Sequence, residues 1–226
     1  MEKYPKIKFC FDLKTQKRMA LEFLRMGWPI HPDLDHLSQY ADENLVKQKI
    51  ASFFENYVQK HCEELSRNFH QAKDSWLPVE ESFYRKVDVL LNAHPWPQKS
   101  YKAMGSVFYA WPRYIKEGRF AFPISSKYIY QANIVIAHEM LHFIVYDYLE
   151  KKFSLTPSER FDRDNKFWQF TENLNALIES GPMWQEFMNG HEAAVKPECR
   201  RLYDEMALIW NTNKEVDNLV KQIFHI

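Results

Sequence analysis

The stretch IVIAHEMLHFIVY, residues 134–146, places two histidines and one glutamate inside an otherwise apolar run. Apolar side chains flank the polar ones on both sides, so the stretch predicts a buried helix from Ile134 to about Leu149. Imidazoles and carboxylates are costly to bury without partners. The stretch therefore predicts a central helix whose polar side chains share a common partner.

His138, Glu139 and His142 form the pattern HExxH. Positions four apart in a helix project from one face, so both imidazoles can reach a single zinc ion. Glu139 lies about 100° around the helix from His138. From there it can hold a water molecule on the zinc and take its proton. A pair of buried, hydrogen-bonded histidines with a chance glutamate is the alternative interpretation.

A catalytic zinc ion has three protein ligands and one open position, so a third ligand is needed. The elongated pattern HExxHxxGxxH would require glycine at 145 and histidine at 148, where the chain has Val145 and Tyr148. We therefore expect a ligand from a later helix and choose Glu172, which follows His142 by 30 residues. Glu179 is the alternative, because seven residues are nearly two helical turns. It lies in the last turn, where the helix dipole disfavours a carboxylate.

The HExxH residues, Glu172 and the segment GRFAFPIS (118–125) together resemble the gluzincins, the thermolysin-like zinc metallopeptidases. The likeness covers roughly residues 100 to 182, and the chain length is similar to that of reduced, single-domain members. The resemblance implies one Zn²⁺ per chain and a peptide or protein substrate. It also implies hydrolysis by a zinc-bound water, with Glu139 passing the proton to the leaving amine.

In such enzymes an antiparallel edge strand precedes the motif helix and forms the upper rim of the cleft. The resemblance assigns this place to residues 118–125, where the backbone of Arg119, Phe120, Ala121 and Phe122 would pair with an extended peptide. A plain structural strand is the alternative interpretation of the segment.

The family often carries an aspartate one turn after the ligand glutamate, where it orients a ligand histidine. This chain has Ala176 there, and Asn175 is the nearest polar residue that could perform a weaker version of the task. A further donor usually stabilises the oxyanion in these enzymes. Tyr203, His191 and Tyr146 are the candidates, and the sequence does not choose between them.

The sequence predicts a mainly helical α+β fold, zincin-like, with a small mixed sheet. Residues 6–11 alternate lysine and apolar residues, as a short strand does. Residues 106–112 and 118–125 are expected to form a hairpin through RYIKEG. Helical spacing predicts the remaining helices over residues 14–26, 42–75 (as one helix or two), 78–92, 156–178 and 198–224.

These elements are expected to form a single domain over residues 1–226. It would comprise a helical part to about residue 95, a metal-binding core over about 100–182 and a C-terminal helix over about 198–224. The helical pattern over residues 156–178 begins at Thr156 with the capping box Thr-Pro-Ser-Glu. It ends at Ser180-Gly181-Pro182.

Composition narrows the class of protein. Lys+Arg and Asp+Glu both number 30, so no basic excess favours nucleic-acid binding. Cys10, Cys62 and Cys199 are odd in number and widely spaced, as expected for the reduced thiols of a cytoplasmic protein. The charged N-terminus does not resemble a signal peptide. No run approaches the ~18 apolar residues of a membrane helix.

Two further functions stay open at this point. The first is a regulatory metallopeptidase that cuts one protein partner. The second is a non-catalytic interaction domain in which a fourth protein ligand closes the zinc site. The sequence does not indicate the oligomeric state.

Overall fold

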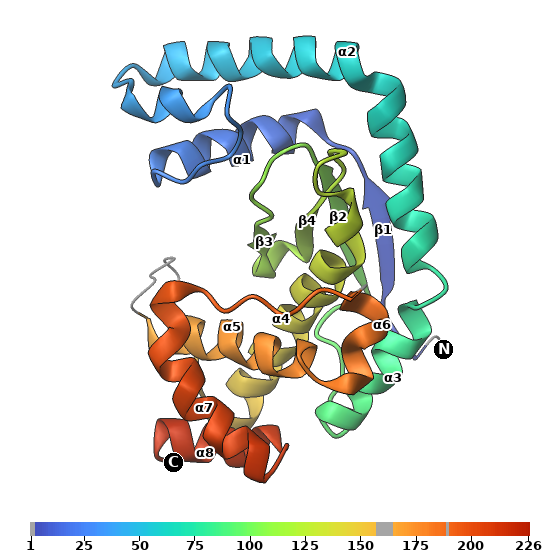
Figure 1. Cartoon of the computed structure of the whole chain (residues 1–226), viewed down its shortest axis with the longest axis vertical. Coiled ribbons are helices and arrows are strands. Elements are labelled where there is room, and N and C mark those ends of the chain that lie inside the picture. The colour runs from blue at the N-terminus through green and yellow to red at the C-terminus, as the bar shows by residue number, and fades with distance from the viewer. Residues whose placement is uncertain (1–2, 157–164, 189) are drawn as a thin grey trace. The chain divides into compact units, whose positions relative to one another are not determined.

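The computed structural model describes residues 3–156, 165–188 and 190–226. It is mainly helical, with a small mixed sheet of four strands (Figure 1), which confirms the predicted α+β class. The chain divides into two compact units, Met1–Pro78 with Gln98–Ile136, and Val79–Pro97 with Ala137–Ile226. Within the described residues, no helix combines the length and apolar character needed to span a membrane.

The sheet belongs to the first unit and has the order β1-β2-β4-β3. Its strands are β1 (Lys6–Cys10), β2 (Ser100–Ser106), β3 (Arg113–Tyr114) and β4 (Arg119–Pro123). β1 and β4 both pair with β2 in parallel, whereas β3 pairs with β4 antiparallel. The first strand is therefore where the alternating pattern predicts it.

The predicted hairpin between residues 106–112 and 118–125 is wrong in its first strand, because the antiparallel partner of β4 is β3 (Arg113–Tyr114) and not a strand over residues 106–112. β2 ends at Ser106, and it runs parallel to β4, so the two cannot form a hairpin. Val107 and Phe108 are buried although they follow the end of the strand. These residues are apolar because the connecting segment is buried, and not because it pairs as a strand. The periodicity of apolar residues alone does not distinguish a buried connection from a strand.

The predicted edge position of Arg119, Phe120, Ala121 and Phe122 is also wrong. In the sheet order β4 lies between β2 and β3. Arg119 is in register with a residue of β2 on one side and of β3 on the other. The backbone N–H of Ala121 donates to the carbonyl of Pro112 at 2.9 Å. The backbone from Arg119 to Ala121 is thus paired within the chain and does not offer the free edge that peptide pairing requires.

The first unit also contains two long helices, α1 (Leu13–Arg25) and α2 (Glu43–Trp76). Each begins at an aspartate whose carboxylate accepts hydrogen bonds from the first-turn backbone N–H groups, Asp12 in α1 and Asp42 in α2. α2 is interrupted once, at His61, where φ is −116° and ψ is 16°. Short 3₁₀ turns complete this unit at Asp35–Gln39, Ile115–Glu117 and Ile129–Gln131.

Among the described residues of the second unit, the regular structure is helical. Its helices are α3 (Glu80–Leu90), most of α4 (Ala132–Phe153), α5 (Lys166–Glu179), α6 (Gln185–Met188), α7 (Arg200–Thr212) and α8 (Val216–Phe224). Short 3₁₀ turns lie at Pro182–Trp184 and Pro197–Cys199. α5 begins at Asn165, whose side chain accepts from the backbone N–H of Trp168. The predicted capping box at 156–159 falls largely outside the described residues. α5 ends at Glu179 with Ser180 as its C-cap, in agreement with the predicted stop at Ser180-Gly181-Pro182.

The predicted single helix over residues 198–224 is wrong, because α7 and α8 are separate. Asn213 and Glu215 have extended backbones, with φ and ψ of −148° and 111° at Asn213. The end of α7 and the first residue after it, Asn211-Thr212-Asn213, are residues with low helix propensity. The five residues from Asn211 to Glu215 are all polar, so the apolar spacing of α7 stops at Trp210 and resumes at Val216.

Candidate metal centre

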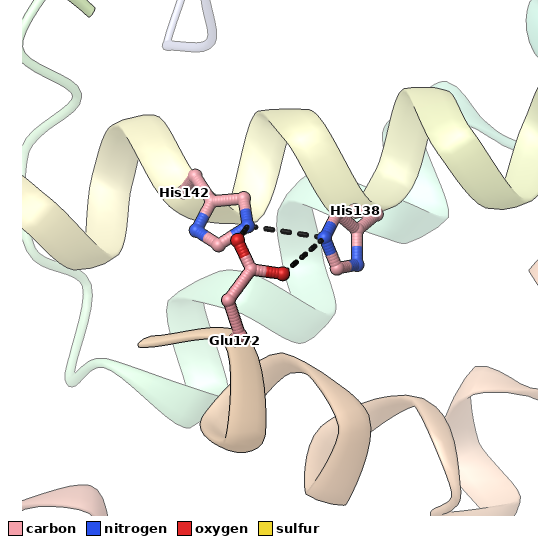
Figure 2. A group of neighbouring side chains, drawn as sticks. All are labelled: His138, His142 and Glu172. Carbon is pink, nitrogen blue, oxygen red and sulfur yellow. Dashed lines mark hydrogen bonds and ion pairs between the residues drawn. The ribbon is translucent and has the colours of Figure 1, made fainter. Parts of the chain in front are cut away.

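The two motif histidines lie on one face of α4, as the spacing predicts (Figure 2). Their Nε2 atoms are 3.0 Å apart, and the two rings meet edge to face with centroids 4.7 Å apart. The side chain of His142 is fully buried, whereas that of His138 is 24% exposed. The pair therefore presents two ring nitrogens to one point at the surface of α4.

Glu172 reaches the same point from α5. Its Oε2 lies 3.6 Å from Nε2 of His138, and its Oε1 lies 3.5 Å from Nε2 of His142 (Figure 2). One ligand atom from each of the three residues lies within 4.8 Å of the others. The side chain of Glu172 is only 5% exposed. The structure thus brings together the three residues that the sequence selects, and the group could hold a metal ion.

Glu179, the alternative third ligand, contacts the opposite side of the His138 ring. Its Oε1 lies 2.8 Å from Nδ1 of His138, while Nε2 of the same ring faces Glu172. Glu179 is as deeply buried as Glu172. The two carboxylates of α5 therefore bracket one imidazole and do not occupy the same position.

This bracketing changes the protonation of His138. Burial alone would lower the pKa of the imidazole, but the carboxylate of Glu179 and the hydrogen bond to Glu172 outweigh it and raise the pKa to about 10. Two buried carboxylates around one ring thus form a strongly cation-attracting environment. In the absence of a metal, a proton on His138 balances part of the negative charge of the two carboxylates.

Lys196 supplies a second positive charge. Its Nζ lies 2.8 Å from Oε2 of Glu172 and 4.7 Å from the centre of the Trp168 ring. The side chain is 41% exposed, so the ammonium remains hydrated. The sequence interpretation missed this residue, because Lys196 lies in an irregular segment just before Pro197 where no periodicity marks it.

The donor set suits zinc. Two imidazole nitrogens and one carboxylate oxygen are the ligand types of open, catalytic zinc sites. The surrounding charge agrees, because Glu172 and Glu179 are buried carboxylates that a divalent cation would help to neutralise. In the part of the chain that the structure describes, the ligating group contains three residues and not the four of a closed structural site.

Glu139 follows His138 on α4 and is 5% exposed. It is not one of the three grouped ligands. A helix advances about 100° per residue, so Glu139 projects from α4 in a direction next to that of His138.

The proposed supporting residues have different surroundings. Asn175 donates from Nδ2 to the backbone carbonyl of His138 at 3.0 Å, so it holds the helix and not the imidazole. Tyr146 lies edge to face against His142, with ring centroids 5.6 Å apart, one turn further along α4. Its hydroxyl accepts a long hydrogen bond of 3.5 Å from Thr171. Tyr146 thus packs directly behind one of the ligands.

The other two oxyanion candidates are placed by different contacts. Tyr203 is half-buried on α7, with the Arg200 guanidinium 5.6 Å from its ring centre. His191 is exposed, and its backbone N–H donates to the carbonyl of Met188. His191 is not part of the grouped ligands.

In comparisons with known proteins, no protein-family model matches the chain, and neither a curated protein nor a solved structure matches it.

Proposed function

We propose that the chain is a zinc-dependent metallopeptidase of the gluzincin type, acting on a peptide or protein. The observation that carries the proposal is the convergence of His138, His142 and Glu172 to within 4.8 Å, with Glu139 at the adjoining helical position. Nε2 of each histidine and the carboxylate of Glu172 would hold the ion. When bound, zinc supplies a Lewis acid that polarises the scissile carbonyl and the attacking water.

Proton transfer is assigned to Glu139. Its carboxylate would take a proton from the attacking water and then donate it to the nitrogen of the leaving amine. Its low exposure supports this role, because a carboxylate shielded from bulk water exchanges its proton with the reactants beside it. The adjoining position on α4 gives the required proximity without using Glu139 as a ligand.

The number of ligands favours an enzyme over a structural zinc site. A structural site is closed by four protein ligands, whereas the group found within the described residues has three. Three ligands leave one coordination position for water or substrate. This count is compatible with both a general peptidase and a peptidase that is specific for one protein partner.

The test compares Glu139→Gln with the wild type. The variant keeps the size of the side chain but cannot accept the proton, so we expect zinc content to be unchanged and peptide hydrolysis to fall by roughly 10² to 10⁴-fold. Zinc is measured by elemental analysis, and cleavage is followed by mass spectrometry on a peptide library and on the chain itself. Glu150→Gln, an exposed position on the same helix, is the matched control and should retain full activity. Zinc-loaded wild type that cleaves neither the library nor itself would contradict the proposal.

A further inference from the structure

We infer that Glu179 is the positioning residue for His138, holding its ring so that Nε2, and not Nδ1, binds the metal. This inference rests on the proposed function and refines it. It reassigns Glu179 from an alternative ligand to the residue that orients a ligand.

The ring of His138 has a different partner on each nitrogen. Nδ1 lies 2.8 Å from Glu179, and Nε2 lies 3.0 Å from Nε2 of His142 and 3.6 Å from Glu172. A neutral imidazole has one N–H donor and one lone pair. If Nδ1–H donates to Glu179, the lone pair is on Nε2 and points toward the other two ligands. The carboxylate therefore selects the tautomer that can bind a metal at this place.

One helix supplies both carboxylates. Glu172 and Glu179 are seven residues apart on α5, which is nearly two full turns, so they project from the same face. They are separated by about 10 Å along the helix axis. A ring that stands between them can contact the first through one nitrogen and the second through the other. The observed contacts of His138 with both residues match this geometry.

The position at which the gluzincins often carry an orienting aspartate has an apolar residue in this chain. One turn after Glu172 the chain has Ala176, and the neighbouring Asn175 is engaged with the backbone carbonyl of His138. Glu179 lies one turn further along and is long enough to reach the ring. Glu179 can therefore orient the ring of His138, which Ala176 cannot do.

The location of Glu179 also needs an explanation that packing does not provide. It is the last residue of α5, where the helix dipole disfavours negative charge, and its side chain is only 6% exposed. A buried carboxylate is costly unless it is paired with a donor. The Nδ1–H of His138 supplies that donor. The burial of Glu179 is therefore accounted for by its contact with a metal ligand.

The experiment measures the zinc dissociation constant of the full chain by competition with a chromophoric chelator. We expect Glu179→Ala to weaken zinc binding by roughly 10- to 100-fold, the usual effect of losing a residue that orients a ligand. Glu179→Gln retains an acceptor oxygen without the charge and should have an intermediate effect. Glu172→Ala removes a ligand itself and should cost more than any Glu179 variant. Glu150→Gln should bind like the wild type.

A second measurement separates positioning from general stability. Nitrogen-15 NMR of the histidines in the zinc-loaded wild type should show His138 protonated at Nδ1 and metal-bound at Nε2. In Glu179→Gln the Nδ1 proton of His138 should exchange faster and its signal should shift, while the signals of His142 stay in place. Circular dichroism of the metal-free variants verifies that they fold.

The outcomes are distinguishable. Unchanged zinc affinity in a folded Glu179→Ala variant would overturn the positioning role and leave the proposed function intact. Complete loss of zinc in Glu179→Ala, with retention in Glu172→Ala, would make Glu179 the ligand and overturn the inference. A wild type that binds no zinc would overturn both. Weakened binding in Glu179→Ala with no peptidase activity in the wild type would support the inference and contradict the peptidase.

Discussion

At the scale of single residues, each buried polar group of the candidate centre makes a different contact. His138 and His142 offer Nε2 atoms to one point, Glu172 joins them, and Glu179 contacts the remaining nitrogen of His138. The first three could be selected from the sequence, because HExxH fixes helical geometry and 30 residues allow a returning helix. The contact of Glu179 could not, because the sequence does not show which side of the imidazole a second carboxylate of the same helix will reach.

Lys196 was not predictable for a related reason. It lies outside any periodic segment, and its ion pair with Glu172 depends on how the chain after α6 returns to α5. The pair has a consequence for metal binding. An ammonium group 2.8 Å from a ligand oxygen competes with the metal for that oxygen and repels the incoming cation.

We therefore predict that Lys196→Met strengthens zinc binding. The pair is partly exposed and is worth roughly 0.5–1 kcal/mol, which corresponds to an affinity gain of about two- to fivefold. The measurement is a zinc titration against a competing chelator at moderate salt. Lys214→Met, at an exposed position before α8, serves as the control and should leave the affinity unchanged. Weaker zinc binding in Lys196→Met would show that the ammonium assists the site and does not compete with it.

At the scale of elements, the sequence predicted the helices better than the sheet. α1, α2, α4 and the end of α5 follow from apolar spacing and from capping residues, which act over a few neighbouring positions. The parallel pairing of β1 with β2 joins segments about ninety residues apart. No local signal specifies that pairing. Residues 106–112 were assigned to the first strand of a hairpin that β3 forms with β4 instead. The break between α7 and α8 was not predicted, although the polar run from Asn211 to Glu215 interrupts the apolar spacing there.

The cap of α1 gives a prediction at this scale. Asp12 accepts hydrogen bonds from the backbone of Lys14 and Thr15 and from the hydroxyl of Thr15 at 2.6 Å. We expect Asp12→Ala to lower the free energy of unfolding by about 1 kcal/mol at neutral pH. Urea denaturation of the two proteins provides the measurement. Asp74→Ala, at an exposed position in α2, should change stability much less.

The same cap should be sensitive to acid. The hydrogen bond from the Thr15 hydroxyl, together with those from the backbone, holds the pKa of Asp12 below its ordinary value despite the opposing effect of burial. A lowered pKa in the folded state means that the contribution is present above the unfolded-state pKa and is lost as pH falls through the folded-state pKa. The stability difference between wild type and Asp12→Ala should therefore shrink in acid. A difference that is constant from neutral to strongly acidic pH would contradict this account of the cap.

At the scale of the whole molecule, the site belongs to one unit of the chain. His138, His142, Glu172, Glu179 and Lys196 all lie within the unit formed by Val79–Pro97 and Ala137–Ile226. The boundary between the units falls inside α4, and the units interleave along the chain. The sequence predicted one domain whose parts follow one another in order. Local composition does not indicate which distant segments contact each other, so the interleaving of the units could not be predicted. The candidate ligands are nevertheless supplied by two helices, α4 and α5, that the sequence predicts from apolar spacing and from helix start and stop signals.

The central claim is that a divalent metal binds between these two helices. The most direct test is anomalous diffraction at the zinc absorption edge from crystals of the zinc-loaded protein. The account predicts one strong peak per chain, in contact with Nε2 of His138, Nε2 of His142 and the carboxylate of Glu172, with Glu179 remaining on Nδ1 of His138. A peak located elsewhere in the chain, or no peak in the presence of excess zinc, would contradict it.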